Sequence, residues 1–312
     1  MASADVTLVF LDPEFPRGRV VDAGAPQLFV TDLGPARGDG IFETLLAVDG
    51  QPRKLSAHLS RLATSAEAMD LEIPGREAWA EAVDHAIAEH GETFGAQERS
   101  RLAVRLVATR GNEAVHAPAE NAKAGLQPTC WVQVTPSSLP SKADAKPIKV
   151  LLLDRGYDSG AAARAPWLLL GAKTLSYAVN MAALRHAKKN GADDVIFTTS
   201  DGRLLEGPTS TVLLARVAED GTKTLYTPER KTGILPGTTQ SAIFELAEQA
   251  GWKLGYGPLE SDALFTADAV WLASSVRLVA QVETVDGTAI GQDPELAARL
   301  TDELWDFAER IS

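Results

Sequence analysis

The chain has 312 residues, about twice the ~150 residues typical of one domain, which favours two lobes with a core each. Thirty basic against 42 acidic side chains give a net charge of −12, which argues against a nucleic-acid binder, because such proteins need positive charge for phosphates. The single cysteine, Cys130, excludes an intrachain disulfide and a thiolate zinc cluster and favours a cytoplasmic location. No apolar run approaches the ~20 residues of a membrane helix, and the N-terminal segment does not fit a signal peptide. We therefore expect an ordinary globular protein that does not insert into a membrane.

Turn signals and apolar periodicity divide the first part of the chain into strands and helices. In chain order we expect a hairpin over Ile41–Leu55, helices over Ser56–Met69 (capped by Ser56) and Glu77–Glu89, and strands over 101–110 and 129–136. Together these elements predict a first α+β domain, residues 1–136.

A stretch rich in proline and serine follows and predicts a linker over residues 137–147. Beyond it, in chain order, we expect a strand over 148–154, a helix over Thr174–Asn190, a strand over 193–199, a turn at Ser200-Asp201-Gly202, a short strand over 203–207, strands over 210–216 and 224–228, and helices over Thr238–Ala250 and Glu295–Ile311. These elements predict a second α+β domain, residues 148–312.

Lys173 is the first candidate for chemistry. It directly precedes the expected helix from Thr174, where the helix dipole and partial burial lower the pKa of an amine. Such an amine is suited to forming a Schiff base with a carbonyl, although a solvated lysine near a helix start is the ordinary alternative. Tyr177 follows four residues later, so on a helix its phenol would reach a group held by Lys173.

Glu206 is the second candidate. It lies at the end of the expected short strand, directly before Gly207 and Pro208. A carboxylate at such a strand end can be buried and held in a fixed orientation toward a ligand. A pyridoxal ring needs an acceptor of this kind to keep its ring nitrogen protonated and so act as an electron sink.

The segment 171–214 resembles the class IV aminotransferases, the pyridoxal-phosphate enzymes of fold type IV. This family includes branched-chain aminotransferases, D-amino-acid aminotransferases, R-selective amine transaminases and aminodeoxychorismate lyases. The matching residues are Lys173-Thr-Leu-Ser-Tyr177, Gly191-Ala-Asp-Asp, Asp201-Gly and Glu206-Gly-Pro-Thr-Ser-Thr.

Three further segments extend this resemblance over most of the chain. Arg37-Gly-Asp-Gly-Ile-Phe-Glu-Thr44 and Leu55-Ser-Ala-His-Leu-Ser-Arg61-Leu look like the family's N-terminal landmarks, and Arg61 falls where the family places a phosphate-binding arginine. Gly237-Thr238-Thr239 opens a helix, whose unpaired N–H groups and threonine hydroxyl suit a phosphate. Ser275, rather than the adjacent Ser274, aligns with a further hydroxyl contact to the phosphate.

The resemblance implies a two-domain α+β fold with pyridoxal 5'-phosphate in the cleft between the domains. It implies that Lys173 holds the cofactor as a Schiff base and later serves as the general base on the substrate carbon. It further implies that Glu206 pairs with the ring nitrogen and that Arg61, Thr238, Thr239 and Ser275 hold the phosphate, with Tyr177 beside the ring. Family members are generally homodimers, so a homodimer that completes the active site is expected.

The choice between lyase and transaminase depends on other positions. Branched-chain enzymes usually carry Phe-Glu-Gly where this chain has Phe42-Glu43-Thr44, and their lysine-to-tyrosine segment is one residue longer. The combination here is more like that of aminodeoxychorismate lyases, which implies conversion of 4-amino-4-deoxychorismate to 4-aminobenzoate and pyruvate. A class IV transaminase acting on D-amino acids, branched-chain amino acids or R-amines stays open as the alternative. A catalytically silent pyridoxal-phosphate binder is disfavoured by the intact Lys173 and Glu206.

Arginine is the preferred planar partner of a carboxylate, and the lyase substrate carries two. Arg110 looks like the lyases' substrate-binding arginine, Arg37 and Arg277 are weaker candidates, and Thr44 adds a hydroxyl near the ring by resemblance. Each arginine has an ordinary alternative as an exposed surface residue. His58 and His186 do not support a metal site or a catalytic triad, because neither has partners at a recognised spacing.

Overall fold

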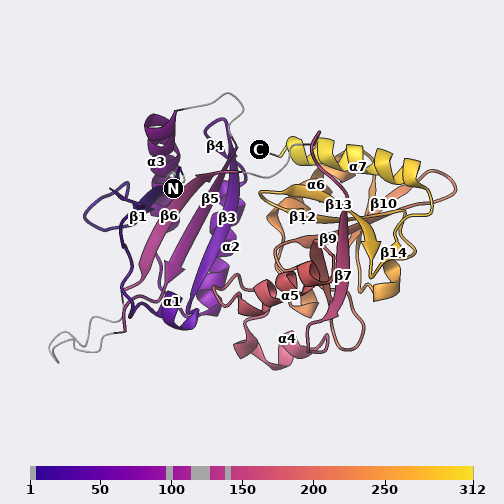
Figure 1. Cartoon of the computed structure of the whole chain (residues 1–312), viewed down its shortest axis with the longest axis horizontal. Helices are drawn as coiled ribbons and strands as arrows, with labels where there is room; N and C mark the ends of the chain where they lie inside the picture. The colour runs from indigo at the N-terminus through magenta and orange to yellow at the C-terminus, as the bar shows by residue number, and fades with distance from the viewer. Residues whose placement is uncertain (1–4, 96–100, 114–126, 138–141, 312) are drawn as a thin grey trace. The chain divides into compact units, whose positions relative to one another are not determined.

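The computed structural model describes residues 5–95, 101–113, 127–137 and 142–311 (Figure 1). The chain divides into two compact units, Met1–Ser138 with Ala172–Tyr177 and Ser312 (unit 1), and Leu139–Gly171 with Ala178–Ile311 (unit 2). The first boundary falls within the expected linker, of which residues 138–141 lie outside the described residues. Unlike the domain division expected from the sequence, the structure groups Lys173 with the N-terminal unit.

Unit 1 is built on a six-stranded antiparallel sheet in the order β2-β1-β6-β5-β3-β4. Its elements are β1 Thr7–Phe10, β2 Arg19–Val21, α1 Leu33–Arg37, β3 Gly40–Val48, β4 Gln51–Pro52, α2 Leu55–Ala68, α3 Arg76–Phe94, β5 Arg101–Thr109 and β6 Thr129–Pro136. The expected hairpin and the two expected strands are therefore confirmed. The segment between β5 and β6 lies partly outside the described residues, at 114–126.

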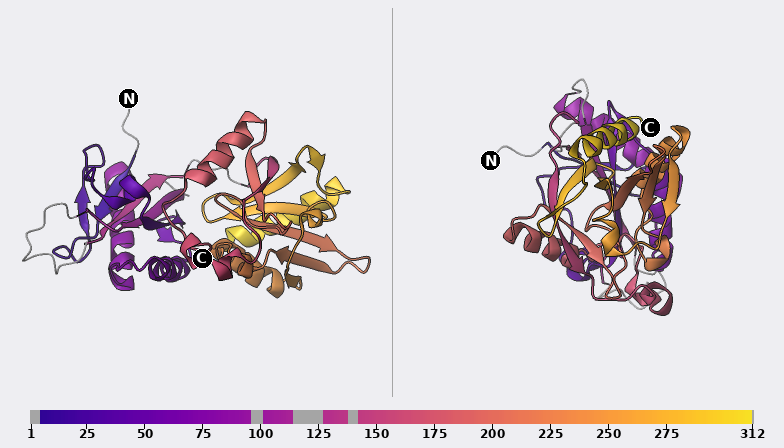
Figure 2. Two further views of the ribbon diagram at one scale, coloured as in Figure 1. Left: turned by 90° about the horizontal axis from the view of Figure 1, so that it is seen from below. Right: turned by 90° about the vertical axis from the view of Figure 1, so that its right-hand side faces the viewer.

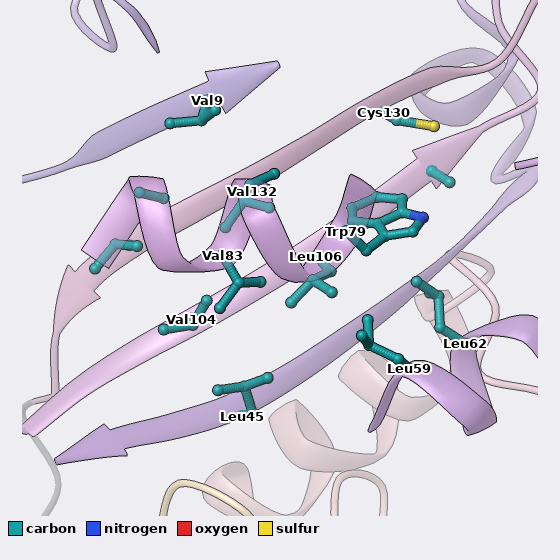
Figure 3. Packing of buried hydrophobic residues seen from close by; sticks show 14 of the residues in the cluster. Val9, Leu45, Leu59, Leu62, Trp79, Val83, Val104, Leu106, Cys130 and Val132 are labelled. Carbon is teal, nitrogen blue, oxygen red and sulfur yellow. The ribbon is translucent and has the colours of Figure 1, made fainter. Parts of the chain in front are cut away.

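One face of this sheet carries the core of unit 1. Alternate residues of β5, among them Val104 and Leu106, point to the same side because side chains alternate along a strand. They meet Leu59 and Leu62 of α2 and the fully buried Trp79 of α3 (Figure 3). The opposite face, which carries Phe42 of β3, is thereby left for other contacts.

Both expected helices of this unit are present, but α3 ends at Phe94 instead of the expected Glu89, and the start of α2 also differs from the expectation. The residue before the helix is Lys54, whose φ of 52° is left-handed, and it makes no side-chain cap. Ser56, expected to be the cap, lies in the first helical turn instead, where its Oγ accepts a hydrogen bond from Arg76. The cap assignment was wrong because the helix begins at Leu55 and its cap position is Lys54, two residues before Ser56.

Unit 2 is built on an eight-stranded mixed sheet in the order β11-β10-β9-β12-β13-β7-β8, with β14 on β13. The strands are β7 Ile148–Asp154, β8 Asp194–Thr198, β9 Thr211–Val217, β10 Lys223–Thr227, β11 Lys253–Tyr256, β12 Ala269–Ser274, β13 Leu278–Val285 and β14 Thr288–Ala289. The helices are α4 Ala161–Arg164, α5 Ala178–Lys189, α6 Thr238–Gln249 and α7 Pro294–Glu309, with 3-10 turns at Pro166–Leu168, Arg230–Thr232 and Ser261–Ala263.

The helices of unit 2 pack on different parts of this sheet. Helix α5 contacts β7 and β8, where Ala183 and Ala187 meet Val195 and Phe197. Helices α6 and α7 contact each other, and α7 runs beside β12 and β13 (Figures 1 and 2). A second core, which includes Val212, gathers buried residues of β7, β8, β9, β12 and β13.

Two sequence-based expectations for this half were wrong. The helix expected from Thr174 begins only at Ala178, because the preceding segment uses its backbone groups to bond with β3 in unit 1. Residues 203–207 form no strand, since only single bridges from Thr198 to Leu204 and from Arg203 to Glu260 are present.

None of the helices in the described part of the chain is both long enough and apolar enough to cross a lipid bilayer.

Candidate active site

The segment that carries Lys173 is fixed to two elements of unit 1. The Phe42 N–H donates to the Lys173 carbonyl at 3.0 Å, and the Leu175 N–H donates to the Gly40 carbonyl at 2.8 Å. The Lys173 N–H donates to Ser65 Oγ on α2 at 3.1 Å. The lysine therefore lies on an extended segment held to β3 and α2, not at a helix N-terminus as expected.

The Lys173 side chain lies against two aromatic rings. Its Nζ is 4.3 Å from the centre of the Phe42 ring and 3.4 Å from the Tyr177 hydroxyl, to which it donates. The Tyr177 ring meets Phe42 edge-on, with 5.1 Å between ring centres. Aromatic faces attract a cation and exclude water on one side of it. The expected proximity of Lys173 and Tyr177 is present, although an extended segment rather than a helical turn produces it.

Arg105 is a cationic residue near Lys173 that the sequence did not single out. Its guanidinium carbon lies 4.6 Å from the centre of the same Phe42 ring. In the register of β3 and β5, Arg105 is directly opposite Thr44, so the two side chains are neighbours on the face that carries Phe42. Within the described residues, no acidic side chain forms an ion pair with Arg105. The alternation of side chains along β5 shows which face of the sheet Arg105 occupies. Its position next to Thr44 and Phe42 follows only from the pairing register of β5 with β3.

Arg61 lies on the other face of β3, in contact with a buried carboxylate. Its Nε and Nη2 donate to the two oxygens of Glu43 at 2.7 and 2.8 Å. His58 Nδ1 lies 2.7 Å from Glu43 Oε2. Burial raises the pKa of Glu43, but Arg61 and His58 outweigh burial and hold the pKa at about 2. The sequence had pointed to Arg61 and missed both its partner Glu43 and the contact of His58 with that carboxylate.

Two of the other predicted substrate residues lie elsewhere in unit 1. Arg110 donates to Asp39 at 2.8 Å and to the carbonyls of Met69 and Asp70. These contacts join the end of β5 to the end of α2, so Arg110 stabilises the fold of unit 1. Arg37 is exposed at the end of α1.

Glu206 lies in unit 2, in the segment between β8 and β9. Its Oε2 accepts the backbone N–H of Leu235 at 3.1 Å, and the side chain is half-buried. Burial, with the nearby Glu206 carboxylate, raises the pKa of the Tyr157 phenol. Tyr157 therefore stays neutral beside a carboxylate that one backbone donor orients.

The predicted hydroxyl residues of unit 2 come together at the start of α6. Thr238 and Thr239 are its first two residues, and their Oγ1 atoms lie 3.2 and 3.3 Å from Ser275 Oγ at the end of β12. All three come from a helix N-terminus and the adjacent strand end, so their hydroxyls and the backbone N–H groups of the first helical turn lie in one region. A helix N-terminus of this kind binds anions well.

The surroundings of this helix start fit a phosphate ester. A Cβ on Gly237 would lie 2.4 Å from Thr211 Oγ1, so only glycine allows this approach of backbone to side chain. Ser210 Oγ and Gln240 Nε2 are buried without a hydrogen-bond partner among the described residues. Donors left without partners in a region rich in hydroxyls are what a bound anion would satisfy.

Arg277, another predicted substrate residue, lies directly before β13. Its Nη1 donates to the buried Asp194 at 2.8 Å, while Nη2 is buried without a hydrogen-bond partner within the described part of the chain. The structure thus gives Arg277 a partner that the sequence did not suggest.

Comparison with known proteins places this arrangement in a family. The model of the amino-transferase class IV family matches residues 40–285. A bifunctional aminodeoxychorismate lyase / D-amino acid transaminase of Mycobacterium tuberculosis is 41% identical over 292 residues, which cover 91% of this chain and 96% of that protein. A solved fold IV transaminase, CpuTA1 of Curtobacterium pusillum, is 40% identical with a TM-score of 0.84, covering 96% of this chain and 99% of the other. A hypothetical aminotransferase of M. tuberculosis, solved in a PLP-bound form and in an alpha-ketoglutarate and PMP bound form, is 39% identical with a TM-score of 0.81, covering 97% and 98%.

The chain therefore belongs to the class IV aminotransferase family and has its type IV fold. This confirms the resemblance seen in the sequence. It is an enzyme of lyase or transaminase type, and the family to which it belongs depends on pyridoxal phosphate.

Proposed function

We propose that this protein binds pyridoxal 5'-phosphate, with Lys173 as the covalent attachment site. The observation that carries the proposal is the fixed position of the Lys173 amine, 4.3 Å from the Phe42 ring and within hydrogen-bonding distance of Tyr177. The hydroxyls of Thr238, Thr239 and Ser275 would bind the phosphate together with Arg61. Glu206 would accept a hydrogen bond from the ring nitrogen.

The cofactor, when bound, supplies an electron sink for the substrate carbon or ring that loses a proton. Side chains of the protein would orient the cofactor and transfer the protons. Glu206 would keep the ring nitrogen protonated, and the Leu235 N–H orients that carboxylate. The Lys173 amine would remove and return protons as a general base, while Phe42 and Tyr177 shield it from water on one side.

For the reaction, we propose the elimination of pyruvate from 4-amino-4-deoxychorismate to give 4-aminobenzoate, a folate precursor. Transamination of D-amino acids is the second candidate, because a relative that is 41% identical carries both activities in its name. Branched-chain and R-amine transamination are the remaining family alternatives. All of these reactions use the same Lys173 and Glu206, so the choice depends on how the substrate is held.

Arg105 is the residue that we propose holds a substrate carboxylate. It shares the Phe42 ring with Lys173, and Thr44 lies opposite it in the register. A guanidinium binds a carboxylate through two parallel hydrogen bonds, which fixes orientation as well as affinity. Arg110 and Arg277 each have an acidic partner already, at 2.8 Å in both cases. Arg105, which the sequence did not predict, is therefore a better candidate for binding the substrate carboxylate than Arg110 or Arg277. The predicted Thr44 lies next to it.

One comparison separates the two activities. The purified protein is incubated with aminodeoxychorismate, and separately with D-alanine and alpha-ketoglutarate, and 4-aminobenzoate and pyruvate are quantified. We expect 4-aminobenzoate from the wild type and none from Lys173→Ala. The lyase proposal fails if no 4-aminobenzoate forms while the amino donor is converted to its keto acid.

The role of Arg105 is tested in the same assay. We expect Arg105→Met to raise the KM for the carboxylate substrate about tenfold or more, since a charged hydrogen bond is worth about 1.5–3 kcal/mol. Arg101→Met is the matched control, because Arg101 begins the same strand, four residues away and opposite Val48. An unchanged KM in Arg105→Met would exclude this assignment.

We also propose a cytoplasmic homodimer. Large apolar side chains are exposed in each unit, Phe29 and Val30 at 72% and 93% in unit 1, and Trp167 and Val179 at 75% and 56% in unit 2. Exposed apolar residues of this size favour burial against a partner, and a second copy is the partner that the family suggests. Light scattering with size exclusion should give twice the chain mass, and a monomer at micromolar concentration would contradict the proposal.

A further inference from the structure

Glu43 is a fully buried carboxylate in unit 1 that takes no part in the proposed reaction. It lies in the middle of β3 with no exposed surface, next to Phe42 but on the opposite face. Its two oxygens accept from Arg61 Nε and Nη2 and contact His58 Nδ1, at 2.7, 2.8 and 2.7 Å. A buried carboxylate is costly unless it is paired and hydrogen-bonded, and these contacts meet that requirement.

The protonation states of the three residues follow from this geometry. With its pKa held at about 2, Glu43 is ionised at neutral pH and can only accept hydrogen bonds. The His58 Nδ1 must therefore carry the proton in this contact. Burial lowers the pKa of His58, against the opposing effect of Glu43, so the ring is neutral at pH 7. The three residues form a cation, an anion and a neutral donor.

Helix α2 places His58 and Arg61 on one side because they are three residues apart. Leu59 and Leu62, each one position further along, point into the core instead. The helix thus has an apolar stripe that anchors it and a polar stripe that meets β3. Ser65, one turn beyond Arg61, continues the polar stripe and accepts the Lys173 N–H.

A guanidinium has five N–H donors in a rigid fork, and Glu43 takes the edge formed by Nε and Nη2. This contact fixes the plane of the guanidinium, and His58 Nδ1 bonds Oε2, the same carboxylate oxygen that accepts from Arg61 Nη2. A long arginine side chain otherwise loses rotamer freedom when it binds a ligand. If the arginine side chain is already ordered before the ligand arrives, this entropy cost no longer reduces the binding affinity.

We propose that Glu43 and His58 are positioning residues that hold the Arg61 guanidinium for the phosphate group of the cofactor. This inference rests on the proposed function, in which Arg61 binds that phosphate. The negative charge of Glu43 weakens the attraction between Arg61 and an anion, so its benefit is orientation rather than field strength. The proposal therefore predicts an effect on ligands that carry the phosphate and no effect on ligands that lack it.

The test compares pyridoxal 5'-phosphate with pyridoxal, which has the same aldehyde and ring but no phosphate. Affinities for the full-length protein without cofactor are measured by absorbance titration for wild type, His58→Leu, His58→Asn, Glu43→Gln and Arg61→Met. His90→Leu is the matched control, because His90 is equally buried in unit 1 and also bonds through Nδ1, to Thr7. The readout is the ratio of the two affinities, which does not depend on catalytic activity.

We expect His58→Leu and Glu43→Gln to lose about tenfold in affinity for the phosphorylated ligand and to keep their affinity for pyridoxal, since bonds to charged groups are worth about a factor of ten. His58→Asn keeps a nitrogen donor near the position of Nδ1 and should restore most of the ratio. His90→Leu should leave it unchanged. Arg61→Met should lower the ratio furthest.

Three results overturn the proposal or its basis in different ways. If His58→Leu and Glu43→Gln keep the wild-type ratio, or lose both ligands equally, the positioning role is wrong. If Arg61→Met keeps the ratio, Arg61 does not bind the phosphate. If the wild type binds neither ligand, the proposed function itself is refuted before any variant is compared.

A measurement on the unmodified protein covers the case in which a variant does not fold. The Nδ1 proton of His58 reports the Glu43 contact directly by NMR. Its resonance should shift when the phosphorylated ligand binds and stay in place with pyridoxal. A resonance that responds equally to both ligands would contradict the proposal.

Discussion

Glu43 gives the protein a pH dependence that can be worked out from the structure. Its pKa is about 2 in the folded chain, against 4.5 as the ordinary value, because Arg61 and His58 outweigh the effect of burial. A group whose folded pKa is lowered stabilises the fold above its unfolded pKa, and this contribution is lost as the pH falls through the folded pKa. Wild-type stability should therefore fall in the window between about pH 5 and pH 2.

The magnitude follows from the same two pKa values. A difference of about 2.5 pH units corresponds to about 3 kcal/mol, and about 2 kcal/mol of it should be lost by pH 3. At neutral pH, Glu43→Gln should be less stable than wild type by about 3 to 5 kcal/mol, because it leaves Arg61 buried without its anion. As the pH falls from 6 to 3, we expect this gap to narrow by about 2 kcal/mol.

Urea unfolding without added cofactor, followed by tryptophan fluorescence, measures the gap. Trp79, fully buried between α3 and the sheet, is one of the six tryptophans and contributes the change from unit 1. Glu81→Gln is the control, because Glu81 is exposed on α3 and the same chemical change there should leave the pH dependence of wild type intact. A gap between wild type and Glu43→Gln that stays constant from pH 6 to 3 would refute the reasoning.

Two further predictions concern the core and the start of α6. Burial raises the pKa of the Cys130 thiol to about 12, so an aromatic disulfide reagent should react with it only after unfolding, and rapid reaction of the native protein would contradict its placement in the core. Gly237→Ala places a Cβ 2.4 Å from Thr211 Oγ1, so we expect a loss of about 1–3 kcal/mol in unfolding free energy and weaker cofactor binding. Gly75→Ala, whose Cβ meets nothing closer than 3.7 Å, is the control, and equal effects of the two substitutions would count against a tight cradle at Gly237.

Local patterns in the sequence were sufficient for most of the regular elements. Strand β5 alternates apolar residues on one face, and α6 begins after Gly237 with a turn of threonines, so both were predicted within one residue of their observed bounds. The family motifs gave Lys173, Glu206 and the hydroxyls at the start of α6. The two threonines and Ser275 then proved to lie within hydrogen-bonding distance.

Contacts between distant segments were not available from the sequence. The segment from Thr174 was expected to be helical, and only the hydrogen bonds of Lys173 with Phe42 and of Leu175 with Gly40 show why it is extended. The partner of Arg61 is 18 residues away on another element, and nothing local identifies Glu43 as that partner. Arg105 gains its significance from a register that pairs it with Thr44.

The central claim is that Lys173 holds pyridoxal phosphate, and covalent capture tests it most directly. The protein is incubated with the cofactor, reduced with borohydride and digested, and the modified peptide is identified by mass spectrometry. We expect one adduct, on Lys173, which is lost in Lys173→Ala and retained in Lys149→Ala, a change at an exposed lysine of β7. An adduct on another lysine, or none from a protein that binds the cofactor, would contradict the account.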